Sequence, residues 1–441
     1  MSGSSSSSAV SSRAGLYRQP NSRWVSGLIQ FLSASLLLIL IGFHLLPDVG
    51  RIQTIFYLTL LPSTLLLLVW RQDWRFLRAW QFACFISVPL VLTLSTLWGD
   101  SATATIKREV SFYFKVLIYF LLFYCALYLV MEQRGDQMLH RWLRWLIALG
   151  TVSCGASLIV YGLDGGFGKL YRIGGISMQN NIDKTAMLYG FHVLFCCYGL
   201  SLEPRRWRWL SWTGLGLGCI YIVLSQTKIP IVMAASAICL AAVVSRSKAL
   251  RIVVVLGVVA VLPATYVLLY GDLPLLHRGE AYSIRLELWA KSLEGFLQSP
   301  WIGSGLVHKQ FIELDRALPH PHNYLIDVAR FAGLAGIAAC LWQLAAIARI
   351  GLRRDALLSW VPGIYLLWFG FGVLAMLIYA QQPLVKPSYI WIFYWIPLAV
   401  LLVHSQLAAA RTGSQTQSQR EPSLVPSLSQ TVNHATSESH G

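Results

Sequence analysis

Long apolar runs, separated by short polar segments, fill most of the sequence. A transmembrane helix needs about 20 mostly apolar residues. About twelve runs meet this condition: 24–46, 52–70, 77–98, 110–131, 142–162, 184–201, 209–225, 229–245, 251–270, 324–347, 357–380 and 390–409. The apolar residues are continuous within each run rather than alternating, which disfavours a membrane β-barrel. The pattern therefore predicts an all-α, polytopic integral membrane protein with about twelve transmembrane helices.

The composition supports the same class of protein. Of the 441 residues, 56% are hydrophobic and 12% are charged, whereas a soluble domain usually carries about 25% charged residues. This composition excludes an ordinary soluble protein and a disordered one. The two ends differ from the rest because they are rich in polar residues, above all Ser. We expect disordered cytoplasmic tails at residues 1–23 and 410–441.

The basic residues predict the orientation in the membrane. If the N-terminus is inside, the inside segments hold 20 of the 35 Lys and Arg residues but 7 of the 19 Asp and Glu residues. Basic triplets such as Arg71, Arg75 and Arg78 recur on every second loop, as the positive-inside rule requires. Both termini are therefore predicted to be cytoplasmic, and nucleic-acid binding is not needed to explain the net charge of +16. As an alternative, the triplets can bind anionic membrane lipids.

One predicted extramembrane segment is large enough to carry chemistry. Residues 271–323 follow nine predicted helices in 24–270 and precede three more in 324–409, and the orientation makes this loop external. The chain has no nucleotide-binding loop of the GxxxxGK[ST] type, and no predicted inside loop is long enough for an ATPase domain. Any reaction must then draw on a gradient or on an activated substrate.

The external loop contains a predicted helix and a tight turn. Residues 281–298 have apolar positions near helical spacing, which predicts an amphipathic helix at the membrane surface. Ser299-Pro300 ends this helix, and Gly303-Ser304-Gly305 makes a turn. A proline then precedes His322 and Asn323, which stand at the start of the tenth span. Free backbone N–H groups at a helix start favour a nearby anion.

Two further cations stand at predicted external ends. Lys228 lies between the seventh and eighth runs, and Arg172 lies in the glycine-rich loop 163–183. Each either faces a cavity or is an ordinary interfacial or solvated charge. The eight cysteines lie in apolar runs without CxxC spacing, and no DxD or His/carboxylate cluster is present, so no metal site is predicted.

The ordered residues of the external loop resemble the O-antigen ligase and polymerase superfamily. They are Arg285 at the start of the surface helix, the turn Ser299-Pro300-Trp301-Ile302-Gly303-Ser304-Gly305, the pair His322-Asn323, and Gly333-Leu334-Ala335-Gly336. The resemblance implies a GT-C-like fold and a glycosyltransferase without metal or other cofactor. It implies an enzyme with its active site at the periplasmic face of the bacterial inner membrane. The implied reaction passes a glycan from undecaprenyl diphosphate to an acceptor hydroxyl.

The resemblance also assigns roles to residues. We expect His322 to be the catalytic base, with Asn323 and His320 in support, because histidine accepts a proton near neutral pH. His44, His277 and His308 are the other histidines whose location competes. We expect Arg285, Lys228 and Arg172, in that order, to bind the donor diphosphate.

This chain departs from the superfamily pattern at a few positions. Members often carry an arginine where this chain has Lys228, and a lysine lacks the bidentate fork. They also often carry glutamine and glutamate where this chain has Asp327 and Phe331. Asp327 and Arg330 are spaced to pair on one helix face.

Several activities fit these features. An O-antigen ligase that uses lipid A–core as acceptor is favoured, because the external loop is compact. An O-antigen polymerase is the alternative. A protein O-oligosaccharyltransferase usually has a longer chain with a further periplasmic domain. A secondary transporter also suits about twelve spans, but transporters usually show repeated halves, which this sequence lacks. Membrane lipids are expected partners and nucleic acid is not.

Overall fold

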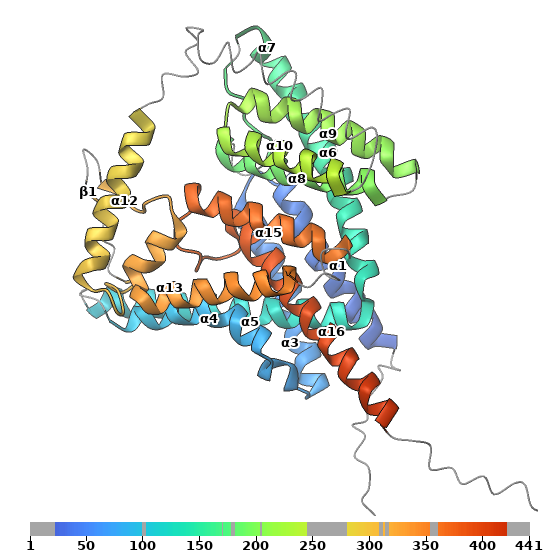
Figure 1. The fold of residues 1–441 in the computed structure, drawn as a ribbon, viewed down its shortest axis with the longest axis vertical. Coiled ribbons are helices and arrows are strands. Elements are labelled where there is room, and N and C mark those ends of the chain that lie inside the picture. The colour runs from blue at the N-terminus through green and yellow to red at the C-terminus, as the bar shows by residue number, and fades with distance from the viewer. Residues whose placement is uncertain are drawn as a thin grey trace, which may run out of the picture.

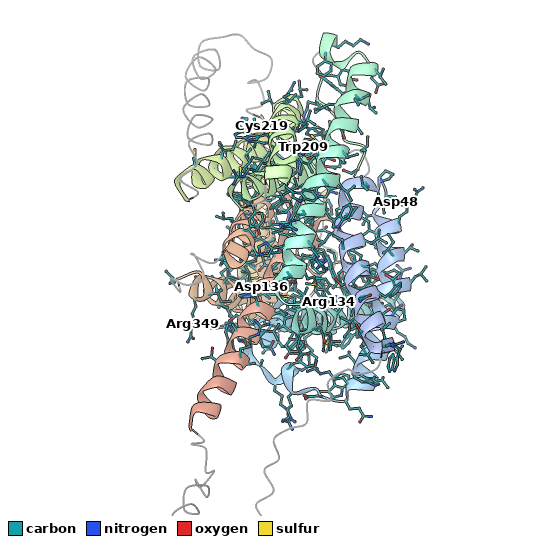
Figure 2. All side chains as sticks on the ribbon, turned by 90° about the vertical axis from the view of Figure 1, so that its right-hand side faces the viewer. Asp48, Arg134, Asp136, Trp209, Cys219 and Arg349 are labelled. Carbon is teal, nitrogen blue, oxygen red and sulfur yellow. The ribbon has the colours of Figure 1, made fainter. Side chains whose placement is uncertain are left out.

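The computed structural model describes residues 23–98, 103–169, 171–177, 181–202, 205–244, 280–307, 312–313, 317–352 and 360–420. Figure 1 shows a bundle of helices, with α12 standing at one side of the bundle across the start of α13. The helices α1 and α6 pack against each other, as Figure 2 shows from the side.

The N-terminal part of the described chain consists of helices joined by non-helical connections. Its elements are α1 (Arg23–Leu45), α2 (Val49–Ile55), the π-helix η1 (Phe56–Leu60), α3 (Leu61–Arg71), η2 (Arg75–Arg78), α4 (Trp80–Leu94), η3 (Ser95–Leu97), α5 (Thr103–Arg134), α6 (Asp136–Leu163), α7 (Gly166–Lys169), α8 (Ile182–Leu202), α9 (Arg205–Ser225) and α10 (Lys228–Val244). The later elements are α12 (Glu280–Gln298), β1 (Ile312–Glu313), β2 (Ala317–Leu318), α13 (Tyr324–Gly351), α15 (Trp360–Tyr379), the π-helix η6 (Trp391–Trp395) and α16 (Ile396–Arg420).

The helices support the predicted multi-pass membrane architecture. In the described residues, seven are long and apolar enough to cross a membrane: Arg23–Leu45, Val49–Arg71, Trp80–Leu97, Lys107–Arg134, Asp136–Leu163, Tyr324–Gly351 and Trp391–Thr412. Shorter apolar helices lie in α10 and α15, and α8 and α9 cover two more predicted spans. The predicted span 251–270 lies outside the described residues. The count of twelve spans stays a prediction.

Two details differ from the sequence prediction. α16 continues to Arg420, although a disordered tail was expected from residue 410. Ala408–Ala410 and Arg411 are good helix formers, so the helix continues beyond its apolar part. The second difference is the antiparallel pair of β1 and β2, in which Ile312 lies opposite Leu318. Strands of two residues are too short to produce a recognisable alternating pattern.

A buried amide joins α4, α13 and η6 in the core. Pro89 interrupts α4 and has no N–H to offer the carbonyl of Phe85 four residues before it. The side-chain amide of Gln343 in α13 donates to the carbonyls of Cys84 and Phe85, both at 3.0 Å. The hydroxyl of Tyr394 donates to Gln343 Oε1 at 2.7 Å. The polar groups are thus satisfied, and α13 is held in a fixed position in the bundle.

Candidate functional site

The predicted surface helix is present as α12 (Glu280–Gln298), and it is anchored to the start of α13. Leu288 is buried, with 1% of its surface exposed. One position further along, Trp289 Nε1 donates to the carbonyl of Pro321 at 2.9 Å. Because Pro321 directly precedes His322, α12 holds the backbone that carries the histidine pair.

The turn after α12 is hydrogen-bonded into a break in α13. At Gly333 the backbone leaves the helix, with φ +59° and ψ −152°. The break leaves carbonyls and N–H groups of α13 without helical partners. The N–H groups of Ser304 and Gly305 donate to the carbonyls of Arg330 and Phe331 at 2.9 and 3.0 Å. In return, the N–H of Leu334 donates to the carbonyl of Pro300 at 2.8 Å.

Glycine is required where these two backbones meet. A Cβ on Gly303 would collide with the backbone of Phe331 and Ala332, and a Cβ on Gly333 would lie 2.5 Å from the carbonyl carbon of Trp301. Both glycines also have positive φ, which other residues rarely adopt. The glycine spacing noted in the sequence is therefore a structural interlock between the 299–305 turn and α13.

His322 and Asn323 stand at the start of α13, as predicted. Asn323 is the N-cap, and its Oδ1 accepts hydrogen bonds from the N–H groups of Leu325 and Ile326 at 3.0 and 3.2 Å. His322 has a positive φ of 57°. This cap fixes the backbone beside His322 and leaves Asn323 Oδ1 committed to the helix.

The two histidines form one compact unit. The ring centroids of His320 and His322 are 4.3 Å apart, and the N–H of His322 points to His320 Nδ1 at 3.4 Å. Burial lowers the pKa of His320 to about 4, with further contributions from the charges of His322, Arg330 and Lys184. His320 is therefore neutral near pH 7 and is a weak base.

Asp327 and Arg330 form the predicted pair and are almost fully buried. Arg330 donates to Asp327 Oδ1 at 2.8 Å, with side-chain exposures of 2% and 1%. Asp327 Oδ2 accepts from the backbone N–H of Gln382 at 2.7 Å, and Arg330 donates to the carbonyl of Pro319 at 3.3 Å. The pair therefore ties α13 to the segment after α15 and to the chain just before the histidines.

The predicted diphosphate-binding cations come from three separate segments. Arg285 of α12 places its guanidinium carbon 5.1 Å from the ring centroid of Tyr379, at the end of α15. Arg172 donates to Asp183 at 2.6 Å and to the hydroxyl of Thr227 at 3.0 Å. Asp183 belongs to α8, which packs against α15. The structure thus brings Arg172 and Arg285 to one region.

Lys228 stands at the edge of the same region. It begins α10 and its side chain is exposed. The preceding residue is Thr227, which Arg172 contacts directly. The role of Lys228 at the donor diphosphate stays a prediction.

Three residues of this region were missed in the sequence. Tyr379 and Asp183 are described above, and Lys184 is the third. Lys184 Nζ lies 4.3 Å from the ring centroid of Tyr389, and its charge acts on His320. Lys184 therefore links the cation side of the region to the histidine side. In the sequence, Lys184 is distinguished only as a charged residue at the start of an apolar run.

The competing histidines do not join this region in the described part of the chain. His44 is buried in the last turn of α1, with its ring centroid 6.3 Å from that of His192. His277 and His308 lie outside the described residues. Within the described residues, no group of three or more His, Cys, Asp and Glu side chains is placed to hold a metal ion.

Known proteins match both the site and most of the chain. A family model described as O-antigen ligase matches residues 213–341, a range that includes Lys228, Arg285 and His322. The O-antigen ligase of Pseudomonas aeruginosa is 28% identical over 394 residues, which cover 86% of this chain and 92% of that protein. With the residue pattern from Arg285 to Gly336 in place on α12 and α13, these matches support the resemblance of the chain to the O-antigen ligase superfamily.

Proposed function

We propose that this protein is an O-antigen ligase. It transfers a glycan from undecaprenyl diphosphate to a sugar hydroxyl of lipid A–core, at the periplasmic face of the bacterial inner membrane. In this proposal residues 24–270 and 324–409 form about twelve membrane spans, 271–323 is the periplasmic catalytic loop, and both termini are cytoplasmic. The match to an O-antigen ligase over most of the chain supports the ligase activity.

The cations stabilise the leaving group. When the bond between the glycan and the diphosphate breaks, negative charge develops on the departing phosphate, and fixed cations stabilise that charge. Arg285 is the primary ligand, because its planar guanidinium can bind a phosphate through two hydrogen bonds. Lys228 and Arg172 add charge beside it. Since diphosphate is a good leaving group, neither ATP nor a metal ion is required.

His322 acts as the general base. It takes the proton from the acceptor hydroxyl as that oxygen attacks the anomeric carbon, and the configuration there is inverted. His320 is less suited to this role, because its pKa of about 4 makes it a weak base. His320 instead orients His322 through the contact with its backbone N–H.

The observation that carries the proposal is the convergence of these residues. Arg285, Arg172 and His322 lie on three segments that are far apart in the sequence. Arg285 contacts Tyr379 at the end of α15, and α15 packs against α8, where Asp183 pairs with Arg172. Trp289 of α12 holds the carbonyl of Pro321 beside His322. A histidine near cations suits glycosyl transfer from a diphosphate, because one group can take the acceptor proton while the others stabilise the leaving phosphate.

The test is transfer by the purified protein from a lipid-linked donor to lipid A–core. We expect His322→Ala to lower the rate by about 10²–10⁴-fold, as loss of a general base typically does, and EDTA to have no effect. Nearly normal transfer by His322→Ala together with an inactive His320→Ala would make His320 the base. If the wild-type protein instead elongates lipid-linked O-units and ignores lipid A–core, the protein is a polymerase.

A separate experiment tests the orientation. Alkaline phosphatase fused at Gly305 should be active, because the positive-inside distribution of charge makes this turn external. The same enzyme fused after Arg411 should be inactive. The reverse pattern would place the histidines on the cytoplasmic side and would exclude the proposed reaction.

A further inference from the structure

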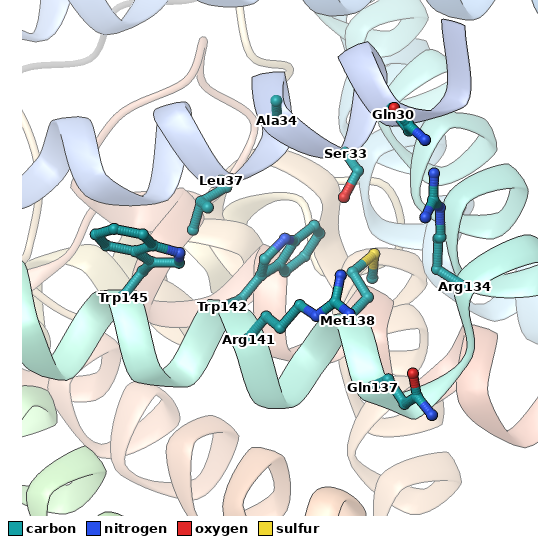
Figure 3. A pocket seen from close by; sticks show the side chains of 10 residues that line it. All are labelled: Gln30, Ser33, Ala34, Leu37, Arg134, Gln137, Met138, Arg141, Trp142 and Trp145. Atoms are coloured by element: carbon teal, nitrogen blue, oxygen red, sulfur yellow. The ribbon is translucent and has the colours of Figure 1, made fainter. Parts of the chain in front are cut away.

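A pocket with no role in the proposed reaction lies between α1 and α6. It has a volume of about 380 Å³ and is lined by Gln30, Ser33, Ala34, Leu37, Arg134, Gln137, Met138, Arg141, Trp142 and Trp145. We name it the α1–α6 pocket. Figure 3 shows the side chains of Arg134 and Arg141 extending toward Gln30 and Ser33 of α1. Cations from the α5–α6 junction thus face polar groups across the pocket.

The pocket has the electrostatic character of an anion site. Two of its ten lining residues are arginines and none is acidic. Neither Arg134 nor Arg141 forms an ion pair with any residue that the structure describes. Ser33 and Gln30 can donate hydrogen bonds to the same anion. Guanidinium groups bind phosphate oxygens through paired hydrogen bonds.

A second pocket provides a contrast. It has a volume of about 620 Å³ and is lined in part by Arg71, Asp73 and Arg75. There Arg71 forms a close ion pair with Glu132, and Arg75 lies 4.0 Å from Asp73. The cations of that pocket are therefore neutralised by the protein itself, unlike those of the α1–α6 pocket.

An exposed apolar surface continues from the α1–α6 pocket along α6. Trp145, Val152 and Ile159 are spaced seven residues apart and so lie on one face of the helix. They are 50%, 59% and 65% exposed, and α6 is long and apolar enough to cross a membrane. A ligand with an anionic head in the pocket and a hydrocarbon chain on this face would match both surfaces.

We propose that the α1–α6 pocket binds the headgroup of an anionic phospholipid. The phosphodiester lies between Arg134 and Arg141, Ser33 and Gln30 contact it from α1, and an acyl chain runs along Trp145 and Val152. The bound lipid joins α1 to the α5–α6 junction. This inference does not depend on the proposed transferase activity.

The test uses the full-length protein, purified in detergent and titrated with phosphatidylglycerol, with bound lipid counted by native mass spectrometry. The variant Arg134→Gln/Arg141→Gln should bind phosphatidylglycerol at least about tenfold more weakly, because charge-assisted hydrogen bonds are lost. The control Arg349→Gln/Arg411→Gln removes two exposed arginines that line neither pocket. It should bind within about twofold of wild type. Zwitterionic phosphatidylcholine should bind more weakly than phosphatidylglycerol to the wild type.

Two results would overturn the proposal. The first is equal binding of phosphatidylglycerol by the wild type and the pocket variant. The second is displacement of the lipid by millimolar inorganic phosphate, which would make the pocket a site for a soluble phosphate. If the pocket variant does not fold, a photoactivatable phosphatidylglycerol can be crosslinked to the wild-type protein. Adducts on 30–37 and 134–145 support the proposal, and adducts found only elsewhere refute it.

Discussion

The two sides of the candidate site are held by different kinds of contact. On the histidine side, the turn 299–305 and α13 meet backbone to backbone at Gly303 and Gly333. On the cation side, side chains hold the arrangement: Arg172 contacts Asp183, and Arg285 lies over Tyr379. Where two backbones are in contact, an added side-chain atom would clash with the opposite backbone. A side chain that makes a contact can instead be replaced without displacing the backbone.

Because of this difference, we expect substitutions on the two sides to affect different properties, the stability of the fold on one side and the reaction on the other. Substitutions at the interlock should displace the segment between Gly303 and Gly333, which includes His322. Substitutions among the cations should leave the fold intact and change only the interaction with the donor. We therefore expect one substitution on the histidine side to disturb that whole side. On the cation side, each substitution should remove only the contribution of the residue replaced.

The largest effect is expected for Gly333→Ala. The backbone at Gly333 has φ +59° and ψ −152°, a region that is essentially restricted to glycine and costs other residues about 1–3 kcal/mol. The new Cβ would also lie 2.5 Å from the carbonyl carbon of Trp301. We expect a lower thermal unfolding midpoint, a poor yield of folded protein, and no measurable transfer.

Gly370→Ala is the matched control. Gly370 lies within α15, and a Cβ there would meet no atom within 4 Å. Alanine is the better helix former by about 1 kcal/mol, so this variant should be at least as stable as the wild type. A Gly333→Ala protein with the unfolding midpoint of the wild type would show that the interlock is not needed.

The next largest effect is expected for Arg285. Removing a cation that stabilises transition-state charge typically costs about 10²–10³-fold in rate, and we expect such a fall in kcat/KM for Arg285→Ala. Arg285→Lys should recover only part of it, because lysine lacks the planar fork. Unlike Gly333→Ala, both variants should unfold at the wild-type temperature. Lys291→Ala, which removes an exposed cation further along α12, should transfer normally, and normal transfer by Arg285→Ala would exclude Arg285 from the site.

Most of the fold could be predicted because hydrophobic length can be read directly from a sequence. Apolar runs predicted the ends of α1 within one residue, those of α13 within four residues and those of α6 within six residues. The extension of α16 to Arg420 was missed, since helix propensity without burial gives a weak signal. The break at Gly333 was also missed, because only the backbone of the 299–305 turn makes that break favourable.

The site could be predicted only where its residues share a motif. Arg285 and His322 stand at recognisable spacings within one loop, and the structure places both in the candidate region. Asp183, Lys184 and Tyr379 stand at the ends of apolar runs, outside any recognisable motif. Their relevance depends on helices α8 and α15 meeting beside α12, and a single sequence contains no record of such contacts.

A smaller effect is expected for Arg172. Asp183 already neutralises part of its charge at a distance of 2.6 Å, so less of that charge is available to the donor than at Arg285. We expect Arg172→Gln to raise the KM for the donor about 3–10-fold with little change in kcat, a loss of roughly 1 kcal/mol. Lys169→Gln, which removes an exposed cation from α7 in the same stretch of chain, should leave KM unchanged. A loss as large as that of Arg285→Ala would mean that the Asp183 pair does not weaken Arg172.

The smallest effect concerns pH and distinguishes His320 from the cations. Its pKa in the folded protein is about 4, below the ordinary value of 6.5, so the unfolded chain takes up a proton between these values while the folded protein does not. The free energy of unfolding must therefore fall as pH decreases from about 6.5 toward 4. His320→Gln removes this titration, and the glutamine Oε1 can still accept a hydrogen bond from the backbone N–H of His322. We expect the unfolding midpoint to drop less between pH 7 and pH 5 in His320→Gln than in the wild type. The other nine histidines are common to both proteins and cancel in the comparison. Equal decreases of the unfolding midpoint in the two proteins would show that His320 is not shielded from protonation. His320 would then again be a candidate for the general base.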